Sequence, residues 1–207
     1  MENVLVAGAN GTTGKKIVTL LESSQYFTPV AMVRKEEQET QFKNRNIKTV
    51  LGDLEKDVSH TVKNIDKVIF AAGSGGKKVK EVDENGAKKL IKESEKENIK
   101  KFVMLSSMGA DNPEEAEDLQ EYLKAKHNAD EYLKSSKLSY SIVRPGSLTD
   151  DKGSGKIELE RKLNKQGEIS REDVAQTLVR VLHDSAEVNE TFEIIKGETL
   201  IGKSIPN

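Results

Sequence analysis

The stretch Asn3-Val4-Leu5-Val6-Ala7-Gly8-Ala9-Asn10-Gly11-Thr12-Thr13-Gly14-Lys15-Lys16-Ile17-Val18 decides the fold of this chain. It starts as a short apolar strand, passes three glycines spaced three residues apart, and continues into a helix. Gly8 allows a sharp turn after the strand. Gly11 leaves no side chain between backbone and ligand, and Gly14 lets the helix pack close to the strand. Exposed N–H groups and the positive end of the helix dipole then face an anion, which indicates a site for the pyrophosphate of a dinucleotide.

Length and composition fit one globular domain of 207 residues with a net charge of −2. This charge balance lacks the broad basic footprint of nucleic-acid binding. The chain has no Cys, which excludes disulfides and Cys-based zinc sites, and the distant His60, His127 and His183 predict no metal site. The sequence shows no long apolar span and starts as a strand instead of a signal peptide. We therefore expect a cytoplasmic protein without nucleic-acid or membrane partners. The sequence is compatible with a homodimer.

Apolar runs alternate with amphipathic stretches along the whole chain. This alternation predicts an α/β protein with a three-layer Rossmann fold, in which a doubly wound, mainly parallel sheet carries helices on both faces. A ligand then lies across the carboxyl ends of the strands. The expected strands are 4–7, 30–33, 47–51, 67–72, 102–105, 140–143, 157–159 and 191–195, and the expected helices are 13–24, 36–43, 58–62, 79–98, 114–135 and one beginning at 170.

A single NAD(P)-binding domain is expected over residues 1–207. Residues from about 150 to 207 form its small C-terminal, substrate-facing region in this interpretation. The segment 149–155, Thr-Asp-Asp-Lys-Gly-Ser-Gly, is predicted to be a flexible loop, because it is rich in small and polar residues.

The end of the second expected strand indicates which dinucleotide is bound. A Rossmann unit specific for NAD usually has an acid here for the ribose 2′-hydroxyl, whereas this chain has Arg34 and Lys35. A guanidinium pairs well with a phosphate, and Thr12 or Thr13 could add a hydroxyl donor. The pattern favours NADP(H) over NAD(H). The alternative is that both cations are ordinary surface charges.

Two further strand ends carry candidate cofactor contacts. Asp53 could accept a hydrogen bond from the adenine amine while Leu54 packs on the ring, although Asp53 could also simply form a turn. The small Ala71, Ala72 and Gly73 would let the backbone approach the ribose and pyrophosphate, or would serve close packing against the glycine turn.

Read together, these segments resemble the short-chain dehydrogenases/reductases. The resemblance is strongest to their atypical NAD(P)-binding, NmrA-like and epimerase/reductase-like subgroup, and it covers nearly the whole chain. It adds Asn10 and Pro145 to the cofactor-binding residues. The segments that carry it are 4–14, 33–34, 52–54, 71–75, 82–86, 102–107, 122–126, 142–146 and 169–175.

The resemblance also implies a catalytic set of Ser107, Tyr122 and Lys126, with Asp83 where the family has an active-site Asn. In active members the Tyr exchanges a proton with the substrate, the Lys binds the nicotinamide ribose, and the Ser positions the substrate. A phenol is a poor acid–base group near neutrality unless a cation stabilises its phenolate form. The i, i+4 spacing places Tyr122 and Lys126 on one helical face.

The function expected from this resemblance is an NADP(H)-binding oxidoreductase or epimerase-like enzyme. Its substrate would be a small carbonyl or hydroxyl compound, a quinone or a flavin. The alternative is a non-catalytic, NADP-binding redox sensor or regulatory protein of the NmrA-like type. The loops that would select the substrate, at 74–80, 108–115 and 149–166, carry no readable signature.

Overall fold

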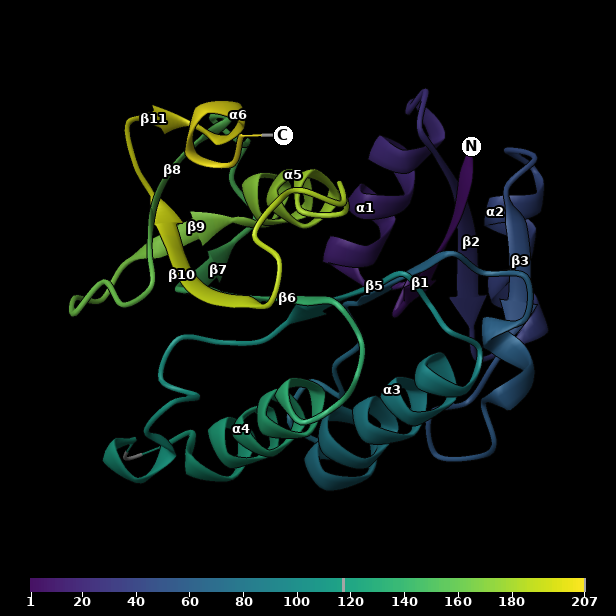
Figure 1. Ribbon diagram of the computed structural model, residues 1–207, viewed down its shortest axis with the longest axis horizontal. Coiled ribbons are helices and arrows are strands. Elements are labelled where there is room, and N and C mark those ends of the chain that lie inside the picture. Colours follow the sequence, from purple (N-terminus) through teal and green to yellow (C-terminus); the bar gives the residue numbers. More distant parts are fainter. Residues whose placement is uncertain (117, 207) are drawn as a thin grey trace.

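A nine-stranded sheet forms the centre of the structure, which is a computed structural model describing residues 1–116 and 118–206 (Figure 1). From β3 to β10 every pair of neighbouring strands is parallel, and β8 and β11 then continue the sheet in antiparallel pairs. The strands in spatial order are β3 (Lys48–Leu51), β2 (Phe27–Val33), β1 (Glu2–Ala7), β4 (Lys67–Phe70), β5 (Lys101–Leu105), β6 (Tyr140–Pro145), β10 (Glu190–Lys196), β8 (Lys156–Glu160) and β11 (Thr199–Leu200).

Helices cover both faces of this sheet (Figure 1). One face carries α1 (Thr12–Glu22) and α5 (Arg171–Arg180), and the other carries α3 (Ala87–Lys96) and α4 (Gln120–Lys134). None of the described helices combines the length and apolar composition that a membrane crossing requires. The predicted three-layer Rossmann fold is confirmed. The shorter helical segments are α2 (Thr40–Lys43), α6 (Ile201–Ser204), the 3₁₀ turns η1 (Glu36–Gln38), η2 (Ser59–Val62) and η4 (Pro113–Glu115), and the π-helix η3 (Val79–Gly86).

The core consists of two apolar clusters separated by the sheet. In β1, Val4 and Val6 face the cluster under α1 and α5, whereas Leu5 and Ala7 face the cluster under α3 and α4. All four side chains are fully buried. A parallel strand covered by helices on both sides needs apolar residues at every position, which explains the uninterrupted apolar run. The chain order reverses between β1 and β4. Open α/β sheets bind their ligands outside the carboxyl ends of the strands at such a switch point.

Several element boundaries differ from the sequence-based expectations. The expected helix 79–98 begins as the π-helix η3 and becomes α-helical only at Ala87. The expected helix 114–135 is divided into η4, which starts at Pro113, and α4, which starts at Gln120; position 117 of that expected helix lies outside the described residues. The fourth strand ends at Phe70, two residues early. The small parallel pair β7 (Ser147–Thr149) and β9 (Glu168–Ser170) was not expected, because three-residue strands show no measurable periodicity.

The expected flexible loop at 149–155 is instead held at its C-terminal half. The Glu172 carboxylate accepts the Gly153 N–H (2.7 Å), and the Asp173 carboxylate accepts the N–H groups of Ser154 (3.0 Å) and Gly155 (2.7 Å). The Gly153 N–H and the Lys16 ammonium hold the pKa of Glu172 below its ordinary value. The prediction was wrong here because the stabilising carboxylates belong to the start of α5, about twenty residues away in sequence.

Candidate dinucleotide and active site

The glycine turn between β1 and α1 has the close backbone contacts that the sequence predicts. Gly8 has φ +88°, and a Cβ atom there would lie 2.6 Å from the Ala72 backbone. A Cβ on Gly14 would lie 2.1 Å from the Gly8 carbonyl oxygen. Such approaches exclude any side chain, so both glycines are required by the packing of this turn. The Gly11 N–H donates to the Gly8 carbonyl oxygen (2.9 Å) and closes the turn.

The first turn of α1 is open to an anion. Its N-cap is Gly11, none of the side chains that the structure describes caps the helix, and the first turn contains no acid. The first N–H groups of a helix lack intrahelical acceptors and carry the positive end of its dipole. Thr12 is exposed at this end and Thr13 is buried. The bare glycine backbone and this uncapped helix start fit a dinucleotide pyrophosphate.

The segment after β2 places Arg34 and Lys35 on the surface, with both side chains exposed. The side-chain oxygen of Gln38 accepts the backbone N–H groups of Arg34 (3.0 Å) and Lys35 (3.2 Å). The side-chain amide of Gln41 donates to the Asn10 side-chain oxygen, 2.5 Å away. The structure thus connects the two predicted cations and Asn10 through two glutamines. Neither glutamine was expected from the sequence, because their only signal is a spacing of three residues on a short helical stretch.

The third strand ends in a tight turn. The Asp53 carboxylate accepts the Glu55 N–H (3.0 Å), as in the turn-forming alternative, and Leu54 is buried under the α3 face. At the end of β4, Ala71 donates its N–H to the Ala7 carbonyl oxygen (2.9 Å), and Ala72 packs against Gly8. A Cβ on Gly73 would lie 3.3 Å from the Asp83 carboxylate. Small residues are therefore required where β4 passes the glycine turn.

Lys126 and Tyr122 meet on α4 at the carboxyl end of β5. Lys126 is 3% exposed. Its ammonium donates to the Leu105 carbonyl oxygen (3.3 Å) and lies 5.6 Å from the centre of the Tyr122 ring. The Asp83 carboxylate is 3.7 Å from the same ammonium. A cation next to an aromatic ring and a carboxylate is electrostatically stabilised in spite of burial.

Asp83 is brought into this cluster by the π-helix η3. It is 1% exposed, and its other carboxylate oxygen accepts the Ser74 N–H (3.0 Å). The buried Ser74 hydroxyl has no partner among the described residues. π-Helical turns are rare and occur frequently at functional sites. The π-helix thereby links the loop after β4 to the Lys126 side chain.

The two serines after β5 have different surroundings. Ser107 is half-buried, and within the described part of the chain its hydroxyl donates only to the neighbouring Met108 carbonyl oxygen (3.2 Å). Ser106 is buried and donates to the Asp130 carboxylate (2.8 Å). The Met108 N–H donates to the carbonyl oxygen of the buried Pro145 at the end of β6 (3.0 Å). Of the two serines, Ser107 has the more accessible hydroxyl.

A buried ionic network supports the end of β6 one turn below Lys126. Arg144 donates through Nε (3.0 Å) and Nη2 (2.9 Å) to the carboxylate of Asp130 on α4. Burial raises the pKa of Asp130. Asp111, in the loop after β5, lies 3.9 Å from Arg144 and pairs with Lys162 (2.6 Å). The network therefore joins α4 and β6 to the loops 108–115 and 149–166, two of the three that are expected to select the substrate.

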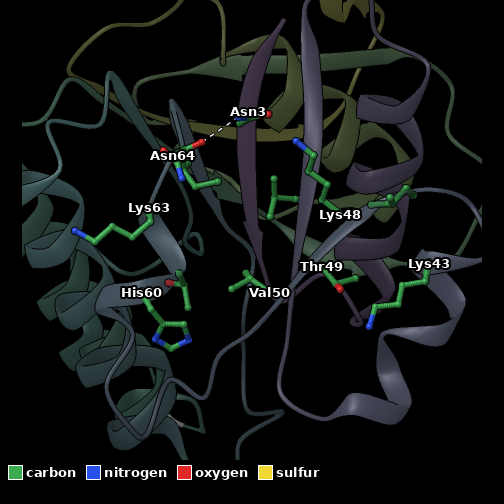
Figure 2. A pocket seen from close by; sticks show the side chains of 12 residues that line it. Asn3, Lys43, Lys48, Thr49, Val50, His60, Lys63 and Asn64 are labelled. Carbon is green, nitrogen blue, oxygen red and sulfur yellow. Dashed lines mark hydrogen bonds between the residues drawn. The ribbon is translucent and has the colours of Figure 1, made fainter.

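A hollow of about 500 Å³ lies elsewhere, between the first half of β1, β2 and β3 and the turn η2 (Figure 2). Asn3 and Asn64 are at one end, and Lys43, Lys48 and Lys63 line its sides. None of the sequence-predicted site residues lines it. It is separate from the carboxyl ends of the strands, where those residues lie.

The strand order, the glycine turn and the uncapped start of α1 define a dinucleotide-binding Rossmann domain. The chain belongs to the NAD(P)H-binding family, whose profile matches residues 8–185. Within this class it is an atypical, NmrA-like short-chain dehydrogenase/reductase, as the sequence resemblance implies.

Three relatives illustrate this membership. The chain is 37% identical to the uncharacterised sugar epimerase YhfK of Bacillus subtilis, over 98% of each chain. A solved structure of a candidate NAD-dependent epimerase/dehydratase from Bacillus halodurans is 38% identical, covers 99% of this chain and 98% of its own, and superposes with a TM-score of 0.94. The oxidoreductase ylbE from Lactococcus lactis is 30% identical, with 98% and 94% coverage and a TM-score of 0.85.

Proposed function

We propose that the protein is an NADP(H)-dependent oxidoreductase or epimerase-like enzyme. Its substrate would be a small carbonyl or hydroxyl compound, a quinone or a flavin. The observation that carries the proposal is the burial of Lys126 beside Tyr122 at the carboxyl end of β5. The descriptions of the relatives YhfK as an uncharacterised sugar epimerase and ylbE as an oxidoreductase support the same two reaction classes.

Each member of the cluster has a distinct chemical task in this proposal. A bound nicotinamide cofactor supplies the hydride chemistry. Reduction of a carbonyl leaves an alkoxide oxygen that needs a proton, and the Tyr122 hydroxyl delivers it. Lys126 holds the nicotinamide ribose and stabilises the phenolate that remains. The accessible Ser107 hydroxyl orients the substrate oxygen, and the region 150–207 provides most of the substrate contacts.

The preference for NADP(H) is supported by charge. Arg34 and Lys35 are exposed at the end of β2, where an NAD-specific unit has an acid. Arg34 is suited to bidentate binding of a 2′-phosphate. The adenine would lie near Asp53 and Leu54.

A turnover screen tests the proposal, with NADPH consumption followed by absorbance against aldehydes, ketones, quinones and flavins. Tyr122→Phe should lower kcat for carbonyl reduction at least 100-fold, the usual contribution of a general acid, and leave NADPH affinity unchanged. Tyr132→Phe is the matched control, because Tyr132 lies on the same helix but packs against the apolar cluster under α3 and α4. Unchanged turnover in Tyr122→Phe would show that Tyr122 is not the proton donor.

The second candidate is a non-catalytic NADP-binding redox sensor. The observation that favours it is Asp83, which places a carboxylate 3.7 Å from Lys126 where the family has an Asn. For a sensor we expect calorimetric binding of NADPH without turnover of any compound in the screen. A pull-down with and without NADP would then show a partner whose capture depends on the cofactor.

A further inference from the structure

Two glutamines connect the Arg34–Lys35 segment to the glycine turn. Gln38 accepts the N–H groups of Arg34 and Lys35 through one side-chain oxygen. The Gln41 amide donates to the Asn10 side-chain oxygen and also to the Gln38 main-chain oxygen (3.2 Å). We call Gln38 and Gln41 the glutamine bridge. It joins the end of β2 to the turn between β1 and α1, which are the two backbone segments that border the proposed 2′-phosphate position.

The neutral side chain of Gln38 is informative, because the backbone N–H groups of Arg34 and Lys35 could equally be accepted by a charged carboxylate. Two backbone N–H donors would bind a carboxylate at least as strongly as an amide oxygen. A Glu at this position would therefore hold the same backbone conformation and add a negative charge beside Arg34. The neighbouring acids Glu36 and Glu37 are exposed, whereas Gln38 is half-buried and its side chain reaches back to the backbone of Arg34. A neutral acceptor at this position suits a site that receives a dianionic phosphate.

We propose that the glutamine bridge determines dinucleotide specificity. It positions Arg34 and Lys35 beside the glycine turn, and the neutral amide of Gln38 keeps a carboxylate away from the 2′-phosphate. Gln38 and Gln41 are positioning residues in this inference, because they act through Arg34, Lys35 and Asn10. The inference rests on the proposed NADP(H) preference and names residues that set it.

Calorimetric titration of the full chain tests the inference with four probes: NADPH, NADH, adenosine 2′,5′-bisphosphate and AMP. The last two isolate the 2′-phosphate. Gln38→Glu should weaken NADPH and the bisphosphate at least tenfold and leave NADH and AMP within twofold, since it retains the acceptor but adds a charge. Gln41→Met, which removes the hydrogen bonds to Asn10 and to the Gln38 main chain, should weaken NADPH about fivefold.

Gln25→Glu is the matched control, because it adds the same charge in the exposed loop beyond the other end of α1. It should leave all four affinities within twofold. Thermal unfolding of each variant verifies that it is folded, and retained NADH binding by Gln38→Glu shows that the site is intact. If the wild type does not prefer NADPH, the proposed cofactor preference is wrong and the inference falls with it. If the wild type prefers NADPH and Gln38→Glu keeps that preference, the inference alone is overturned.

Discussion

The carboxylate of Asp83 and the ammonium of Lys126 form a buried pair, 3.7 Å apart, at the carboxyl ends of β4 and β5. Each group offsets part of the cost of burying the other. The same carboxylate holds the Ser74 N–H, so Asp83 also fixes the loop after β4. A negative charge here opposes the approach of an anionic dinucleotide and competes for the lysine that is proposed to bind its ribose.

Asp83→Asn should therefore tighten NADPH binding by about two- to fivefold. The amide oxygen can still accept the Ser74 N–H, while the repulsion of the pyrophosphate is removed. Calorimetry measures the change. The control is Glu84→Gln, which removes the same charge from a carboxylate that is bound to Lys88 and Asn128. Equal effects of the two substitutions would mean that net charge, and not the Lys126 pair, decides the affinity.

Gly14→Ala should abolish dinucleotide binding and lower stability. Its Cβ would lie 2.1 Å from the Gly8 carbonyl oxygen, so α1 has to move away from the turn. The comparison variant is Gly202→Ala in α6, where a Cβ meets no atom of the described residues within 4 Å. There we expect a stability change of at most about 1 kcal/mol, in the stabilising direction, from the helix propensity of Ala. Titration with NADPH and thermal unfolding of both variants check this, and full affinity in Gly14→Ala would contradict the close packing.

Asp130→Ala should destabilise the fold by about 3–5 kcal/mol, because it leaves the Arg144 guanidinium buried without its carboxylate. The Ser106 hydroxyl loses its acceptor as well. Denaturant unfolding measures the loss. Glu131→Gln is the matched control, because Glu131 follows Asp130 on α4, is exposed and pairs with Lys134 at the surface. For this variant we expect a change of less than about 1 kcal/mol. A small effect at Asp130 would show that the network contributes little net stability.

Lys101 should make stability depend on pH in the alkaline range. Burial, assisted by the nearby Lys67, lowers the pKa of Lys101 to about 8 from 10.5. The folded state releases this proton at a lower pH than the unfolded state. Burial of the charged ammonium therefore lowers the unfolding free energy below pH 8, and this loss of stability disappears as the pH rises towards 10.5. The neutral amine can still donate to the carbonyl oxygens of His183 and Ala186.

The unfolding free energy of the wild type should therefore rise by about 2 kcal/mol between pH 7.5 and pH 9.5, relative to that of Lys101→Met. Groups that titrate in both proteins cancel in this difference. Lys92→Met, at an exposed position of α3, should follow the wild type. Parallel pH profiles for Lys101→Met and the wild type would contradict the lowered pKa.

The sheet and its helices could be predicted from the sequence because each parallel strand is buried on both faces and each long helix has one apolar side. The glycine turn was equally readable, since only glycine fits positions 8 and 14. Local patterns thus sufficed wherever the determining contacts are close in sequence or repeat with a regular period.

The remaining features depend on contacts between distant segments. The ordering of Gly153 and Gly155 by carboxylates of α5 has no local signal. The same holds for the Asp130–Arg144 pair and for the ammonium of Lys67, which pairs with Asp184. In the candidate site, the i, i+4 spacing relates Tyr122 to Lys126, but only the folded chain shows how Asp83 reaches the lysine. The sequence therefore indicates the candidate residues, whereas only the tertiary fold shows which of their charged groups are in contact.

The π-helix has a consequence for how this protein tolerates changes in chain length. A π-helical turn contains one more residue than the hydrogen-bonded turn of an α-helix. Deleting Val82, the uncharged residue before Asp83, would allow an α-helix to form and would rotate the following side chains by about 100°. Asp83 would then leave the lysine and the loop it fixes. A one-residue deletion in this segment would thus separate the charges of Asp83 and Lys126, although it need not remove any charged residue.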